Sequence, residues 1–162
     1  MNTSAFILDQ IYAFLAEIGI PVSETTLSQS TFVPGILIDQ GRLLVDPAKL
    51  LYPGNLLHEA GHIAVTLPAE RWSLYEDVTL GRPDKQGDEL AVILWTYAAC
   101  QQIGIPAAVV FHPAGYKGDS EWLLGLFAQE TYVGLPLLVW MGMTLDQTVA
   151  GGFPQMTSWL RP

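Results

Sequence analysis

The chain has 162 residues, of which half are hydrophobic and 14% are charged, and this composition excludes a disordered protein. Its formal net charge of −9 excludes nucleic acid as an expected partner, because phosphate backbones attract basic surfaces. Its single cysteine forms no internal disulfide, and its first residues lack the basic start of a signal peptide, so we expect a cytoplasmic protein. No apolar stretch reaches the roughly 20 residues that a transmembrane segment needs.

A helix and a β-hairpin are predicted first along the chain. Apolar residues recur at helical spacing over residues 4–19, and the sequence "GIP" ends that pattern. In residues 35–46, "GILIDQGRLLVD", apolar runs lie on both sides of a turn at residues 39–41. Two apolar runs joined by a short turn are typical of a hairpin.

A second helix is predicted after the turn "YPGN". Asn55 is its predicted N-cap, because an asparagine side chain can accept a bond from a free backbone N–H of the first turn. Pro68 should end the helix at about Leu67. The charged stretch that follows, residues 70–89, predicts an exposed irregular connection with a turn at residues 81–87, "GRPDKQG".

The rest of the chain predicts mostly helices. In a helix over residues 88–105, apolar side chains would cover almost the whole circumference, which indicates a buried helix. Residues 107–113, "AAVVFHP", predict a strand or an extended segment. Residues 119–142 predict one or two helices, capped by Asp119 or Ser120, and the tail "FPQMTSWLRP" predicts irregular structure.

Together these elements predict an α+β fold, with one mostly helical domain over residues 1–162. We expect the small early sheet to pack against the helix that carries the sequence "HEAGH". Residues 35–100 should hold the core of the functional site. Residues 101–162 should form a helical part to which no role is assigned.

The sequence "HEAGH" contains the candidate metal ligands His58 and His62. Residues four apart lie on one face of a helix, so both imidazoles can bind one ion. Zn²⁺ accepts neutral imidazole nitrogens and functions with three protein ligands, although other first-row divalent metals suit the same donors. Glu59 lies one step round the helix and is the candidate catalytic base for a water molecule acidified by the metal. The alternative is a His/Glu cluster that satisfies its own hydrogen bonds without an ion.

A third ligand has to come from elsewhere in the chain. Glu89 is the preferred candidate, because it opens a buried apolar helix where an unpaired carboxylate would be costly. Asp88 is the next candidate, either as a ligand or as an acceptor for a histidine N–H group. Both residues could instead simply place negative charge at a helix N-terminus. Four further residues are weaker candidates for the third ligand: Glu76, Asp77, His112 and Glu121.

These two motifs resemble those of a known family. "LLHEAGHIAV" followed by "ELAVILWTYAA" is similar to the zincin metallopeptidases of the gluzincin type, and in particular to the small ImmA/IrrE-type metallopeptidase domains. The resemblance covers roughly residues 35–100. It implies a zincin-like fold, with His58, His62 and Glu89 as metal ligands and Glu59 as the base. Ile93 departs from the pattern, since the family usually has asparagine there, and no helix-turn-helix segment is evident.

The resemblance also implies a substrate, namely a peptide or protein. In zincins the sheet edge beside the active-site helix binds an extended chain, and "FVPGILID" (32–39) would be that edge; a plain hairpin that covers the core is the alternative. His112 or Tyr116 could stabilise the oxyanion formed on the substrate, although an exposed loop histidine is the preferred explanation of His112. The sequence therefore predicts a zinc-dependent hydrolase of the metallopeptidase class. The alternatives are a catalytically silent metal-binding module and an interaction domain without metal.

Overall fold

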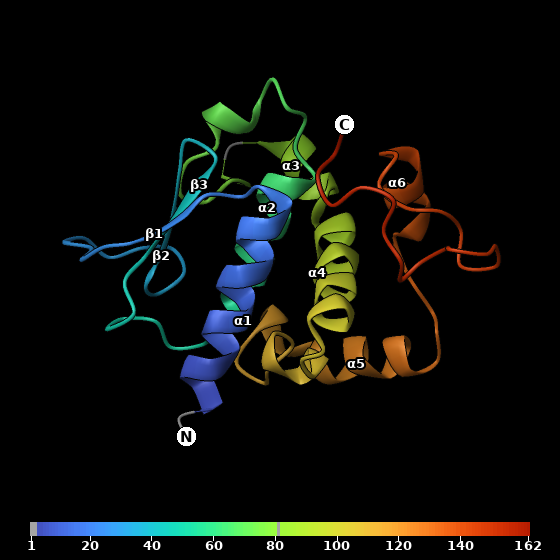
Figure 1. Ribbon diagram of the computed structural model, residues 1–162, viewed down its shortest axis with the longest axis horizontal. Coiled ribbons are helices and arrows are strands. Elements are labelled where there is room, and N and C mark those ends of the chain that lie inside the picture. Colours follow the sequence, from blue (N-terminus) through green and yellow to red (C-terminus); the bar gives the residue numbers. More distant parts are fainter. Residues whose placement is uncertain (1–2, 81) are drawn as a thin grey trace.

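The computed structural model describes residues 3–80 and 82–162 and confirms the α+β fold. Its first half contains one long helix, a small sheet and the "HEAGH" helix: α1 (Thr3–Ile18), β1 (Val22–Glu24), β2 (Ile36–Asp39), β3 (Arg42–Val45) and α2 (Asn55–Ala64). Its second half is helical: α3 (Pro83–Gly87), α4 (Glu89–Ile103), α5 (Ser120–Ala128) and α6 (Leu135–Trp140). In Figure 1 the sheet lies on one side of α1, α2 and α4, and α6 lies on the other.

The predicted hairpin forms the main part of the sheet. Strands β2 and β3 pair in antiparallel register through a two-residue turn, in which Gln40 and Gly41 have φ values of 52° and 76°. Two successive positive φ values match the twist of a tight hairpin. Strand β1 pairs in parallel with β3, so the strand order is β1-β3-β2. Strand β1 was not predicted, because its three residues carry no strand pattern of their own.

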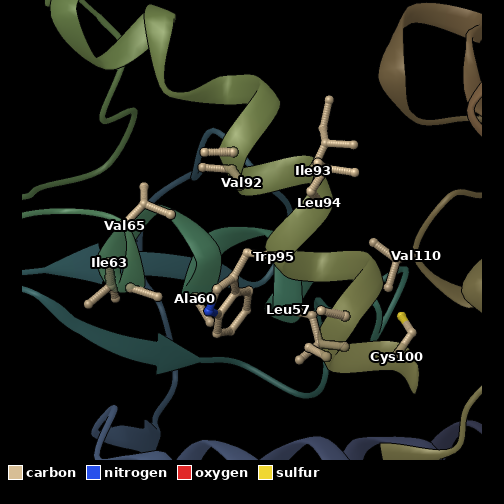
Figure 2. Close-up of a cluster of buried hydrophobic side chains, with 14 of the residues drawn as sticks. Leu57, Ala60, Ile63, Val65, Val92, Ile93, Leu94, Trp95, Cys100 and Val110 are labelled. Carbon is tan, nitrogen blue, oxygen red and sulfur yellow. The ribbon is translucent and has the colours of Figure 1, made fainter. Parts of the chain in front are cut away.

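Helices α2 and α4 pack closely because α2 carries a glycine at their contact. A Cβ atom at Gly61 would lie 2.9 Å from Cγ1 of Val92 and 3.2 Å from the Trp95 ring. Figure 2 shows Ala60 of α2 in one packed cluster with Val92 and Trp95 of α4. The close contact sets the distance between the "HEAGH" residues and the first turn of α4.

Residues 157–162 form a strap across the C-terminal end of α2 and the middle of α4. The backbone N–H of Arg161 donates to the Ala64 carbonyl at 2.8 Å, and its guanidinium donates to the Val65 carbonyl. The Trp95 indole N–H donates to the Trp159 carbonyl at 2.9 Å. Because two of these bonds satisfy carbonyls at the C-terminal end of α2 and the third joins α4, the strap holds the two helices together.

Several local predictions were wrong. Gly54, and not Asn55, is the N-cap of α2, and it provides no side-chain bond. Helix α2 ends at Ala64, before the predicted Leu67. The segment "AAVVFHP" begins with a short 3-10 helix (Ala107–Val109) and is no strand, because Pro106 and a following turn bend the chain.

Other predictions were confirmed, at least in part. Residues 119–142 form two helices, α5 and α6, and Asp119 is the N-cap residue of α5, although its side chain makes no cap bond. The charged connection contains α3, and Gly81 of the predicted turn lies outside the described residues. In the part of the chain that the structure describes, none of the helices has the length and apolar character required to cross a membrane.

Candidate metal centre

The histidine pair lies on one face of α2, as its spacing predicts. The two Nε2 atoms are 3.2 Å apart, and the rings meet edge to face with centroids 4.9 Å apart. His62 is buried and His58 half-buried. Both Nε2 atoms face the start of α4.

Glu89, the first residue of α4, completes a group of three. Its Oε1 atom lies 3.2 Å from Nε2 of His58, and its Oε2 atom lies 3.4 Å from Nε2 of His62. Within residues 3–80 and 82–162, His58, His62 and Glu89 form the cluster of three that could hold a metal ion, with donor atoms within 4.8 Å of one another. The preferred third candidate from the sequence is therefore the residue that meets the histidines.

The spacing of the two histidine nitrogens fits one tetrahedral ion. Zinc–nitrogen and zinc–oxygen bonds of about 2.0–2.1 Å place neighbouring tetrahedral ligands about 3.3 Å apart. In the structure the two Nε2 atoms are 3.2 Å apart, and they lie 3.2 and 3.4 Å from the two different oxygens of the Glu89 carboxylate. Three protein ligands leave one coordination position for water or substrate, which is the arrangement of catalytic zinc sites.

Tyr116 orients the first histidine from the opposite side. Its hydroxyl oxygen lies 2.9 Å from Nδ1 of His58, while its ring stacks on Phe111 with centroids 4.8 Å apart. When Nε2 of His58 binds a metal, Nδ1 carries the proton and donates to the Tyr116 oxygen. Such partners of a ligating histidine fix its ring and its tautomer.

The charges in the cluster shift the pKa values of its members. Burial lowers the pKa of His58, but the hydrogen bond to Glu89 and the nearby Glu59 charge outweigh burial and leave this pKa raised. Burial, together with the His58 charge, lowers the pKa of His62 to about 4. His62 therefore stays neutral well below pH 7, in the form that binds a metal.

Glu59 is buried beside the cluster. Burial raises the pKa of its carboxyl group to about 7, the His58 charge acts in the opposite direction, and Glu89 and Asp77 raise it further. A carboxylate with a pKa near neutral pH can both accept and return a proton there. That property suits the base role that the sequence predicts for Glu59.

The other acidic candidates lie in different surroundings. Asp88 has a raised pKa because of burial, which Lys85 and Arg161 counteract, so the charges that influence it most are cationic side chains. Asp77 accepts bonds from the backbone N–H and the hydroxyl of Thr79. Glu121 lies in the first turn of α5. None of these three belongs to the cluster formed by the described residues.

His112 is buried, in contrast to the exposed loop histidine considered as an alternative. Its Nε2 atom donates to Oδ1 of Asn55 at 2.9 Å, and its ring stacks on Tyr52 with centroids 3.8 Å apart and planes 13° apart. Asn55 was predicted as a helix cap, but its side chain instead accepts the hydrogen bond from His112. The role of Asn55 could not be found in the sequence, because His112 lies 57 residues further along the chain.

A cleft with two hollows crosses the cluster. Five residues line both hollows: Phe32, His58, Glu59, Glu89 and Lys117. The first, here called the aromatic hollow, has a volume of about 460 Å³ and is lined further by Pro34, Leu51, Tyr52, Asn55, His112, Ala114, Gly115 and Tyr116. The second, here called the polar hollow, has a volume of about 530 Å³ and is lined further by His62, Asp77, Val78, Thr79 and Gln86. The cluster is thus reached from two chemically different sides.

The sheet edge that was expected to bind an extended substrate is partly occupied by the chain itself. The Ile38 carbonyl accepts the backbone N–H of Glu76 at 2.9 Å, and Asp39 pairs with Tyr75. The N–H of Ile36 donates to the Val33 carbonyl. The role of this edge in substrate binding stays a prediction, and the groups at Ile38 are already bonded.

Comparisons with known proteins add no relative. No protein-family profile, curated protein or solved structure matches the chain. The resemblance to zincins thus rests on the two sequence motifs and on the three-residue cluster. The structure establishes a possible metal-binding group in an α+β fold.

Proposed function

We propose that the protein is a zinc-dependent hydrolase that cleaves peptide bonds. The observation that carries this proposal is that two imidazole nitrogens, 3.2 Å apart, face the Glu89 carboxylate, whose two oxygens lie 3.2 and 3.4 Å from them. His58, His62 and Glu89 would hold the ion. A zinc ion there would act as a Lewis acid that polarises a carbonyl group and makes water more acidic.

The chain's own residues would carry the proton transfers. Glu59 would take a proton from the attacking water and give it to the leaving amine, a double role open to a buried carboxylate next to a metal ligand. Tyr116 holds His58 through Nδ1 and so acts as a positioning residue. His112 already donates its Nε2 proton to Asn55, which favours a structural role over the oxyanion role considered for it.

The cleft favours catalysis over a silent metal-binding module. Both hollows reach Glu59 and Glu89 from the surface, so a substrate and a water molecule can approach the cluster. A purely structural zinc site is normally closed by four protein ligands. Here the residues that the structure describes offer three.

Two measurements test the proposal. Metal analysis of the protein purified without chelators should give a zinc stoichiometry near one, and Glu59→Gln should retain that zinc. On a peptide library, Glu59→Gln should reduce cleavage by about 10²–10⁴-fold, because the general base is lost. Bound zinc without cleavage in the wild type would support the silent module, and no binding of added Zn²⁺ would end both metal-dependent functions.

A further inference from the structure

The two hollows of the cleft differ in the side chains that each adds to the shared residues. The side chains that line only the polar hollow include the carboxylate of Asp77 and the amide of Gln86. Those of the aromatic hollow carry no charge apart from what His112 can acquire. A substrate that crosses the cluster therefore meets an apolar surface on one side and a polar surface on the other.

The aromatic hollow also exposes large apolar side chains. Phe32 is 69% exposed, Leu51 67% and Tyr52 38%. Large apolar side chains gathered in one concave surface are unfavourable in water and mark sites of ligand contact. An apolar group bound among them would remove this surface from water.

The back wall of the aromatic hollow is a fixed stack of two rings. Tyr52 lies flat on His112, and Asn55 holds the His112 ring by accepting its Nε2 proton. Burial also lowers the pKa of His112, which keeps the ring neutral. A flat, uncharged wall is well suited to another aromatic ring, because offset stacking adds to the gain from apolar burial.

We propose that the aromatic hollow is a specificity subsite, which binds an aromatic or large aliphatic side chain of an extended polypeptide beside the cluster of His58, His62 and Glu89. This inference rests on the proposed function for the identity of the ligand as a polypeptide. The subsite is continuous with the cluster, because Phe32, Glu59 and Lys117 line both hollows. The polar hollow on the opposite side then fixes the direction in which the chain lies.

Peptide binding without turnover tests the subsite. The probes are fluorescein-labelled decapeptides in an Ala/Ser/Gly background with one variable position, and the protein is zinc-loaded Glu59→Gln, measured by anisotropy. Peptides with Phe or Leu should bind at least about tenfold more tightly than those with Asp or Lys, as expected for an apolar pocket. Equal affinity for all four peptides would overturn the proposal.

Matched variants locate the preference in one hollow. Ala114 and Gln86 are both exposed and line the aromatic and the polar hollow respectively. Ala114→Trp should fill the aromatic hollow and abolish the preference for Phe, whereas Gln86→Trp should keep it. Leu51→Asp, at an exposed position, should reduce the preference even if Ala114→Trp fails to fold. If both Ala114→Trp, in folded form, and Leu51→Asp retain the full preference, the subsite lies elsewhere.

The same experiments separate the subsite from the proposed activity. If the wild type cleaves no peptide but the Phe preference and its loss in Ala114→Trp are seen, the hydrolase proposal fails and the subsite stands. If peptides are cleaved with no preference for apolar residues, the hydrolase proposal stands and the subsite is wrong.

Discussion

Helix α2 and the loop at residues 111–117 face each other across the cleft, and each contributes a side chain to the arrangement around His58. In α2 the backbone is helical throughout, so His58 and His62, which are four residues apart, lie on one face of the helix. In the loop, Tyr116 and Lys117 both have a φ of 54°, a left-handed conformation that is unfavourable for residues other than glycine. The regular helix thus provides two of the three donors, and the strained loop provides the partner that orients one of them, His58. Such strain persists only where the surrounding structure enforces it.

The largest effect on zinc affinity is expected when a histidine of α2 is replaced, in contrast to the histidine of the loop. His62→Ala removes one of three donors, and we expect the zinc affinity to fall by more than roughly 100-fold, beyond the range for partners outside the coordination shell. His112→Ala, the matched loop variant, loses its contacts with Tyr52 and Asn55 but no donor of the cluster. Competition with a chromophoric chelator measures both. An equal loss in the two variants would contradict the distinction between helix and loop.

The pH dependence of the metal-free protein tests the buried Glu59 of α2. Its pKa in the folded protein, about 7, lies above the ordinary value of 4.5. Its contribution to stability is therefore fully present below about pH 4.5 and is lost as the pH rises to 7. Between these limits the wild type should lose up to about 3 kcal/mol relative to Glu59→Gln, which has no proton to release.

Urea unfolding with a chelator, at a series of pH values, measures that difference. The pKa of His62 is lowered from 6.5 to about 4, so its contribution makes stability rise with pH. Because His62 is present in both proteins, this contribution is common to the two profiles. Parallel pH profiles of the wild type and Glu59→Gln would show that Glu59 is not desolvated as the structure indicates.

The contribution of the loop should be smaller. Tyr116→Phe keeps the ring on Phe111 and removes only the hydroxyl that bonds Nδ1 of His58, so zinc affinity should fall by about 10–100-fold. Tyr12→Phe is the control, because its hydroxyl donates to Glu24, between α1 and β1. A Tyr116→Phe protein with wild-type zinc affinity would mean that the loop does not orient the ligand.

The smallest effect should come from the contact between α2 and α4. Gly61→Ala places a Cβ atom 2.9 Å from Val92, and overpacking of this kind costs about 1–3 kcal/mol, which the better helix propensity of alanine offsets by about 0.5–1 kcal/mol. Gly125→Ala in α5 meets nothing within 4 Å, so it should stabilise the protein by about 0.5–1 kcal/mol. Thermal unfolding that shows both variants stabilised would refute the role of Gly61.

The sequence was informative where chemistry and regular structure coincide. The repeat of α2 predicted the shared face of His58 and His62, and a lone carboxylate on an apolar helix predicted Glu89. The sequence did not predict β1, the pairing of Asn55 with His112, or the contact of Tyr116 with His58. Each of these depends on where a distant segment arrives in space, and residues 58 apart carry no local signal of their contact.

The strap at residues 157–162 has a consequence for how the site is assembled. The bonds that Arg161 makes to Arg71 and Val65, and that Trp159 makes to Trp95, join residues 90, 96 and 64 positions apart. Contacts of such long sequence separation slow folding, because a large loop must close before they form. During synthesis, α2 and α4 emerge long before the residues that tie their ends together. The packing of α2 and α4 that holds the metal donors is therefore completed only after residues 157–162 have been synthesised.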